Sequence, residues 1–166
     1  MEGLQEIMGG FGAGLVTALA VENLLYCFIG VVTGTAIGVL PGIGPMATIA
    51  MLLPITFHIT PVGALIMLAG IYYGAQYGGS TTAILVNLPG EASSVVTTLD
   101  GYQLAQQGKA GTALSVAAVG SFFAGIAGIA TTVLFGPLLT AMALKLQPAD
   151  YCALMALGLV SAIVLA

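Results

Sequence analysis

The stretch that decides the fold reads LLYCFIGVVTGTAIGVL over Leu24–Leu40 and continues directly into PGIGP over Pro41–Pro45. The first part is uncharged and apolar, and it is close to the length of about 20 residues that a bilayer-crossing α-helix needs. The second part ends that helix, because proline lacks a backbone N–H and its ring clashes with the preceding turn. We therefore expect a membrane-spanning helix that breaks at residues 41–45.

The rest of the chain shares this apolar character. Of the 166 residues, 59% are hydrophobic and only 5% are charged, with a formal net charge of −4, whereas soluble domains carry about 25% charged residues. Residues 23–90 contain no Asp, Glu, Lys or Arg. As helix they would extend for about 100 Å, enough for roughly three crossings of a bilayer core. Composition therefore predicts an all-α integral membrane protein, a bundle of several spans, and excludes a soluble globular domain.

Glycine and proline divide this uncharged run. Residues 46–58 form an apolar piece too short to span, and the next piece runs from Pro61 to about residue 77. We expect a second interruption at residues 78–82 and a turn at residues 87–91. Two stripes of glycine at every fourth residue predict faces where helices approach closely. The stripes are Gly30, Gly34 and Gly38 in the first span, and Gly70, Gly74 and Gly78 in the later piece.

The flanking segments complete a single transmembrane domain over residues 1–166. Residues 3–21 favour a short helix at the membrane interface, and Gly111–Phe135 is long enough for a span. Between the spans, residues 92–110 are the most polar part and are expected to form a connection outside the membrane. Within it, Asp100 resembles the N-cap of a short helix that stops at Gly108. The chain ends in apolar sequence at Ala166, so we expect it to be the N-terminal part of a longer permease.

The interruptions are the candidate binding sites. In hydrocarbon every backbone polar group needs a partner, so an unwound segment must be buried in protein or line a wet cavity. Half-helix N-termini at such breaks suit carboxylates, and unwound carbonyls suit Na⁺. Pro45 could occupy the first position of one half-helix, and Ser80 could cap another. The alternative interpretation is that both interruptions are ordinary kinks between packed helices.

Other residues also leave two interpretations open. Tyr73 belongs to an interfacial aromatic belt or to the packing between helices, or it forms the wall of a substrate cavity. Glu91 is a functional acid if it lies at membrane depth, or an ordinary acid at the water boundary.

The sequence offers little support for an enzyme. It has one His and no Gly-x-Ser-x-Gly context, so no nucleophile arrangement is evident. It also lacks a phosphate-binding loop with Lys and any Cys/His spacing for a metal, and it contains no Arg that would favour nucleic acid. We predict a protein that is not an enzyme and has no cofactor, and that transports its substrate with an ion gradient.

At the interruptions the sequence resembles a known family, the large membrane subunit of the tripartite tricarboxylate transporters. The resemblance rests on ordered motifs from about Asn23 onward. They are Gly38-Val-Leu-Pro-Gly-Ile-Gly-Pro45, Tyr72-Tyr-Gly-Ala-Gln-Tyr-Gly-Gly-Ser-Thr-Thr-Ala-Ile-Leu85, Asn87-Leu-Pro-Gly-Glu91, Asp100-Gly-Tyr102 and Gly108-Lys-Ala-Gly111.

The resemblance implies a fold, a function and partners. Such subunits import citrate or related tricarboxylates and dicarboxylates across the bacterial inner membrane, driven by a Na⁺ or H⁺ gradient. They work with a small membrane subunit and with a periplasmic binding protein that delivers the substrate. Their fold implies broken or re-entrant helices, with this chain as the first of two inverted repeats. A passive channel or a non-transporting membrane scaffold subunit is the alternative function.

The resemblance also assigns residues to the site. It places substrate and ion binding at the two breaks, with candidate Na⁺ ligands at residues 42–45 and 79–81, and it includes two motif residues of structural character. The binding residues are Pro41, Gly42, Gly44, Pro45, Tyr73, Gly78, Gly79, Ser80, Thr81, Asn87, Pro89, Gly90 and Glu91; the structural residues are Asp100 and Gly101.

Overall fold

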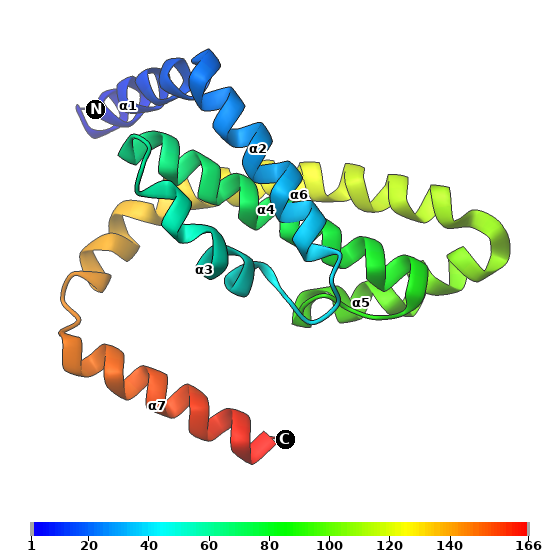
Figure 1. The fold of residues 1–166 in the computed structure, drawn as a ribbon. Helices are drawn as coiled ribbons and strands as arrows, with labels where there is room; N and C mark the ends of the chain where they lie inside the picture. Colours follow the sequence, from blue (N-terminus) through cyan, green and yellow to red (C-terminus); the bar gives the residue numbers. More distant parts are fainter. Residues whose placement is uncertain (1, 166) are drawn as a thin grey trace. The chain divides into compact units, whose positions relative to one another are not determined.

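The computed structural model describes residues 2–165, and every element in this range is helical (Figure 1). Four helices come first: α1 (Glu2–Ala18), α2 (Val21–Gly38), α3 (Pro45–Thr56) and α4 (Pro61–Val86). Short helical turns follow: η1 (Ala92–Ser94), α5 (Val95–Thr97), and the π-helical η2 (Thr98–Tyr102) and η3 (Ala105–Lys109). The long helices α6 (Ala110–Ala143) and α7 (Pro148–Leu165) complete the chain. The predicted all-α fold is confirmed.

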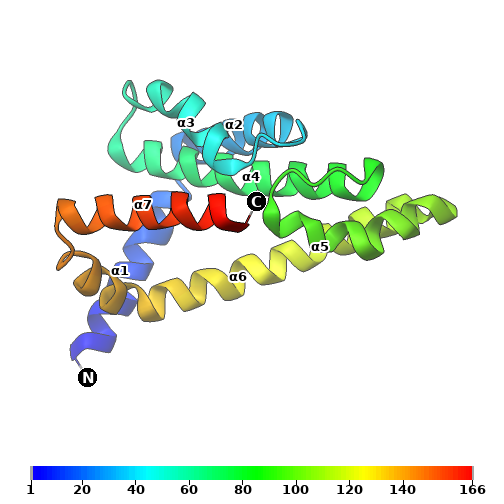
Figure 2. The ribbon, with the colours of Figure 1, turned by 90° about the horizontal axis from the view of Figure 1, so that it is seen from below.

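The chain divides into two compact units, one up to Val119 and one from Gly120 onward. In the first unit α4 is the central helix. Its buried side chains form most of the core, and both α2 and α3 pack on it along the same side (Figure 2). The core side chains of α4 are Met67, Ile71, Ala75, Ala83 and Ile84.

Both glycine stripes are faces of close helix approach, as predicted, and the structure shows that they face each other and join α2 to α4. Gly30 lies against Met67, Gly34 against Ile71 and Gly38 against Ala75, in each case backbone to backbone. A side chain on any of these glycines would collide with the main chain of α4, so the close approach requires glycine.

The order of these contacts fixes the direction of the helices. Residue numbers rise together along α2 and α4, so the two helices run parallel. The chain must therefore return from the end of α2 to the start of α4 through residues 39–60. Only α3, with 12 residues, is helical in this return, and at 1.5 Å per residue it covers about 18 Å. An irregular segment, residues 39–44, makes up part of the remaining distance.

The helix ends show why these boundaries occur. Pro45 opens α3 at its first turn, as predicted, with Gly44 at the N-cap. Thr60 caps α4 by accepting a hydrogen bond from the Gly63 N–H at 3.2 Å, and Pro61 follows it. At the other end, Asn87 terminates α4 in the left-handed conformation, with φ 60°. Asn and Gly are the residues that most readily adopt this conformation at a helix end.

One predicted interruption is wrong. Residues 78–82 do not unwind, because α4 continues to Val86. The hydroxyls of Ser80, Thr81 and Thr82 each bond to the carbonyl four residues earlier, at 3.1, 2.9 and 3.3 Å. Such back-bonding satisfies the hydroxyl inside a helix. Ser80 is therefore not an N-cap.

The prediction for Asp100 is also wrong. Asp100 lies inside η2, where the backbone is already helical from Val95 onward, so it does not begin a helix. Gly108 does interrupt the winding as predicted, with φ 77°.

Two helical segments are long and apolar enough to cross a membrane, α2 and residues Ala105–Ala143. Helix α2 covers residues 24–38 of the span predicted at residues 24–40 and ends two residues earlier, and Ala105–Ala143 contains the whole span predicted at residues 111–135. Large apolar side chains cover much of the surface, among them Phe28 of α2 and Phe122 of α6, which are 66% and 65% exposed. Exposed apolar area on this scale is typical of a protein in contact with lipid. The membrane depth of residues 3–21 and 92–110, the inverted repeat and the single domain over residues 1–166 stay predictions.

Candidate functional site

The irregular segment at residues 39–44 meets the end of a second irregular segment, residues 87–91. A methyl group placed on Gly44 would lie 3.5 Å from Glu91 Cβ and 3.7 Å from the Gly90 carbonyl oxygen. One placed on Gly90 would lie 2.5 Å from Gly79 Cα and 3.3 Å from the Gly38 carbonyl oxygen. We call this meeting point, formed by Gly38, Gly44, Gly79, Gly90 and Glu91, the junction.

The junction forms because the chain folds back after α4. Gly79 lies seven residues before the end of α4 at Val86, which is about 10 Å along the helix axis. After Asn87 the chain returns along α4 to the level of Gly79. This fold-back places Gly90 and Glu91 beside the ends of α2 and α3.

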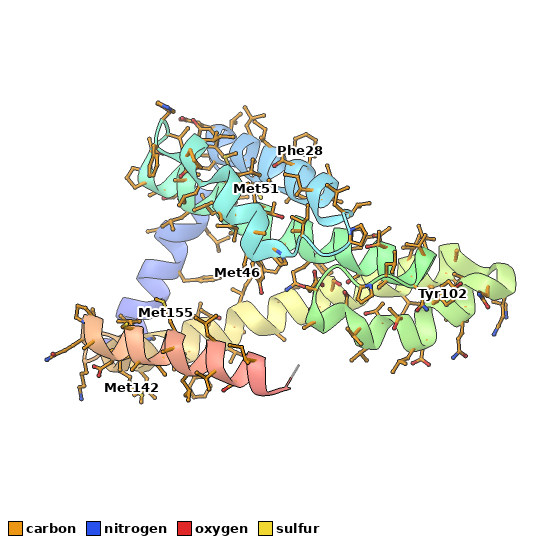
Figure 3. The ribbon with its side chains drawn as sticks, turned by 60° about the horizontal axis from the view of Figure 1, so that its bottom comes forward. Phe28, Met46, Met51, Tyr102, Met142 and Met155 are labelled. Atoms are coloured by element: carbon orange, nitrogen blue, oxygen red, sulfur yellow. The ribbon has the colours of Figure 1, made fainter. Side chains whose placement is uncertain are left out.

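The first turn of α3 faces solvent-accessible space at one side of the junction. The first helical hydrogen bond of α3 runs from the Thr48 N–H to the Gly44 carbonyl, at 3.2 Å, so the N–H groups of Met46 and Ala47 have no acceptor within the helix. Both residues are exposed, and Met46, at 75% exposure, points away from the ribbon (Figure 3). Free N–H groups at a helix N-terminus attract anions such as carboxylates.

The irregular segment before α3 depends on glycine at one further position. Gly42 has φ 83°, a left-handed conformation that costs other residues roughly 1–2 kcal/mol. Pro41 and Gly42 are exposed, whereas Pro45 is buried. The predicted break at residues 41–45 is therefore confirmed as an unwound turn that leads into a half-length helix.

Glu91 is the charged group of the junction. Its Oε2 is buried and has no hydrogen-bond partner in the described part of the chain. A methyl group on Gly79 would lie 2.5 Å from this oxygen, so the carboxylate rests directly on the backbone of α4. Glu91 itself lies in the connection after α4, outside the helices that are long and apolar enough to span. Burial raises the pKa of the Glu91 carboxyl, and hydrogen bonds from Ser93 and Ser94 oppose this rise.

The structure brings some of the predicted site residues together and leaves others apart. Pro41, Gly42, Gly44 and Pro45 lie on one side of the junction, and Asn87, Pro89, Gly90 and Glu91 on the other. Gly79 closes the junction from α4. Gly78 instead packs against Thr35 and Val39 of α2.

The remaining predicted residues serve other contacts. Tyr73 is 50% exposed and packs edge-to-face on Tyr72, with ring centroids 5.9 Å apart. It precedes Gly79 by six residues, about 9 Å along the helix. Gly101 is buried against Ile84, and Asp100 is exposed. Residues 79–81 were expected to be unwound and to offer carbonyl oxygens to Na⁺, but they lie within the helix α4.

Sequence reasoning missed the polar side chains that surround Glu91. Gln76 of α4 accepts a hydrogen bond from the Ser93 hydroxyl at 3.3 Å and donates to the Tyr72 hydroxyl at 3.1 Å. Ser94 is buried, and its hydroxyl donates to the Glu91 carbonyl at 2.9 Å. The available signal for Gln76 was a polar amide side chain, one turn before Ser80, in a helix that has no charged side chain.

These features define a helical membrane protein with an unwound, carboxylate-bearing junction beside a half-length helix. Comparison with known proteins gives the family. Residues 24–166 match the model of the tripartite tricarboxylate transporter TctA family, and the chain belongs to that family. A curated relative in Agrobacterium vitis is described as an uncharacterised 52.8 kDa protein in the TAR-I ttuC′ 3′ region. It is 57% identical over 163 residues, which cover 98% of this chain and 32% of the relative. The chain thus spans about a third of the length of that relative. No solved structure matches this chain.

Proposed function

We propose that this chain is the first part of the substrate-translocating subunit of an importer for citrate or related tricarboxylates and dicarboxylates. The importer uses a Na⁺ or H⁺ gradient, resides in the bacterial inner membrane as a multi-pass protein, and receives substrate from a periplasmic binding protein. A small membrane subunit completes the complex. Membership of a tripartite transporter family supports this proposal, and the geometry of α2, α3 and α4 supports a translocation site in this part of the chain.

The observation behind the site is the parallel direction of α2 and α4. If α2 spans the bilayer, residues 39–60 must cross it in the opposite sense. A bilayer core is about 30 Å thick, and α3 provides about 18 Å of helix. The return crossing is therefore a half-length helix preceded by unwound backbone. Such discontinuous crossings form substrate and ion sites in secondary transporters.

The chemistry of the half-helix suits the substrate class. Its N-terminus offers the free N–H groups of Met46 and Ala47 and the positive end of the helix dipole, equivalent to about half a unit charge. The described residues include only two cationic side chains, Lys109 and Lys145, and neither belongs to the junction. The helix terminus is thus the positive feature available to a carboxylate in this part of the protein.

The proposal is tested by uptake of labelled citrate into vesicles that contain the full-length subunit, the small membrane subunit and the binding protein. We expect saturable uptake that requires a Na⁺ or H⁺ gradient. Gly42→Ala should reduce uptake, because it strains the unwound turn, whereas Gly120→Ala on the exposed surface of α6 should not.

Three results would contradict the proposal. Uptake that ignores both gradients would exclude gradient-driven transport by this subunit. Conduction without saturation and without the binding protein would indicate a passive channel. A complex that transports normally when this subunit is replaced by its Gly42→Ala variant would remove the unwound turn from the mechanism.

A further inference from the structure

The starting point is the buried oxygen of Glu91. Oε2 rests against the backbone of Gly79, and no donor in the described part of the chain reaches it. A buried carboxylate oxygen without a donor is costly in its ionised form, and the neutral acid is the form that such surroundings favour. Geometry alone therefore singles out Glu91 within the junction.

No charged side chain near Glu91 compensates this oxygen, and the positive end of the α3 dipole at Gly44 only partly opposes the cost of the ionised form. The elements packed around it are α4, the end of α2, the 39–44 segment and η1. Among their titratable side chains, Tyr72, Tyr73 and Tyr77 lie on α4, and Glu22, Tyr26 and Cys27 lie in the first turns of α2, more than 15 Å from Gly38 by helix length. The 39–44 segment and η1 contain none, and η2 contributes only Asp100 and Tyr102 beyond them.

The Ser93 hydroxyl lies between two acceptors. Its oxygen is 3.3 Å from Glu91 Oε1 and also 3.3 Å from Gln76 Oε1. A hydroxyl has one proton to donate, so Ser93 can donate to only one of them at a time. Glu91 belongs to the irregular segment at residues 87–91, and Gln76 belongs to α4. The acceptor that Ser93 uses therefore decides whether its hydroxyl connects η1 to that segment or to α4.

We propose that Glu91 is a proton-binding group, and that its protonation transfers the Ser93 hydrogen bond from Glu91 to Gln76 of α4. In the ionised state, Oε1 is the stronger acceptor, because hydrogen bonds to a charged group are roughly twice as strong. When a proton adds to Oε2, Oε1 becomes an ordinary carbonyl oxygen and Gln76 Oε1 competes for the donor. The inference rests on the proposed function in one respect, since the bound proton would then be the coupling ion.

The surroundings of Oε2 favour a proton over Na⁺. Hard cations are held by several oxygen ligands, whereas Oε2 lies against the backbone of Gly79 and has no hydrogen-bond partner in the described part of the chain. The described residues also contain no group of three or more acidic, His or Cys side chains that could hold a metal ion. A single proton needs only one lone pair.

Protonation would also change the charge beside the half-helix. Glu91 Cβ lies close to Gly44, the N-cap of α3, where the proposed carboxylate binds. An ionised Glu91 repels that carboxylate, and a protonated one does not. Proton binding at Glu91 and anion binding at α3 therefore favour each other.

The test is pH-dependent infrared difference spectroscopy on the purified full-length subunit, which needs no transport. We expect a C=O band of a protonated carboxylic acid that titrates above the usual range of glutamate. Glu91→Gln should remove the band, and the matched variant Asp100→Asn should leave it. Ser93→Ala removes a donor to the carboxylate and should move the titration midpoint up by about half a pH unit or more. Gln76→Leu removes the competing acceptor and should move it down.

Each outcome decides the inference. It is overturned if the band survives Glu91→Gln, or if Ser93→Ala and Gln76→Leu move the midpoint in the same direction. It is also overturned if replacing choline chloride by NaCl at constant ionic strength lowers the midpoint, because Na⁺ would then occupy Oε2. Should Glu91→Gln fail to fold, the opposite shifts of the other two variants still decide. If Glu91 titrates as predicted here but the subunit does not transport citrate, the proposed function is rejected and the proton-binding role of Glu91 is not.

Discussion

The interlocked glycines of α2 and α4 give a quantitative prediction for Gly34→Ala. A methyl group on Gly34 would lie 2.8 Å from Ile71 Cα and 2.9 Å from its carbonyl carbon, and closer still to the carbonyl oxygen. Carbon atoms pack best at about 3.5–4.0 Å, so the two helices must separate locally by roughly 0.7 Å or more. All three atoms belong to the backbone of α4, and no flexible side chain can move aside.

The expected magnitude follows from two opposing effects. Overpacking costs about 1–3 kcal/mol, and replacing glycine by alanine inside a helix returns up to about 1 kcal/mol. We expect Gly34→Ala to destabilise the protein by about 1–2 kcal/mol. Gly120→Ala in α6 is the matched control, because a methyl group there meets nothing within 4 Å. The control should stabilise the protein by about 0.5–1 kcal/mol.

The assay is equilibrium unfolding of the full-length subunit in mixed micelles, followed by loss of helical circular dichroism. The two alanine variants should move the unfolding midpoint in opposite directions. If Gly34→Ala proves as stable as Gly120→Ala, then α2 and α4 do not approach this closely, and the parallel arrangement that requires the return crossing loses its support.

Three further predictions use the same unfolding assay. Asn87→Ala should lower the free energy of unfolding by about 1 kcal/mol, because Asn87 has φ 60°. Asn87→Gly should leave it almost unchanged. Equal effects of the two substitutions would show that the left-handed conformation at this helix end is not required. Gly90→Ala should destabilise more than Gly79→Ala, because its methyl group meets backbone at 2.5 Å, whereas that of Gly79 first meets the movable Glu91 side chain; the reverse order would contradict the fold-back. Burial raises the pKa of Glu91 in the folded state, so its contribution to stability is complete below the unfolded pKa and is lost as pH rises through the folded pKa. The Glu91→Gln variant should not show this loss of stability as pH rises. If the free energy of unfolding depends on pH in the same way in the variant and in the unmodified protein, Oε2 is in contact with water.

Much of the fold could be predicted because its signals are local. The span at residues 24–40 follows from apolar length, and the break at residues 41–45 follows from two prolines around a left-handed glycine. The turn at Asn87 also has a local cause. Each glycine stripe could be recognised because its spacing of four residues is a property of one helix at a time, but the pairing of the two stripes could not.

The wrong predictions share a physical cause. Glycine, serine and threonine at residues 78–82 suit an unwound segment, but they equally suit a helix that packs closely and bonds its hydroxyls to its own carbonyls. Composition cannot distinguish these uses, since the difference lies in what packs against the helix. Gly78 faces α2, and Gly79 faces Glu91.

The candidate site itself could be predicted only in part. Its two irregular segments are visible in the sequence, but their meeting is not, because it depends on the return of the chain along α4 after Asn87. The roles of Gln76 and Ser93 depend on that return as well. They are 17 residues apart in sequence and become neighbours only through the fold-back.

The most direct test of the account is substrate protection at the first turn of α3. In the full-length subunit with Cys27, Cys152 and every cysteine outside residues 1–166 replaced by serine, Met46→Cys places a single thiol beside the free N–H groups of the half-helix. We predict that a membrane-impermeant thiol reagent modifies this cysteine, and that citrate slows the modification while a neutral sugar does not. A thiol that the reagent cannot reach, or one that reacts equally fast with and without citrate, would contradict a carboxylate site at the unwound turn.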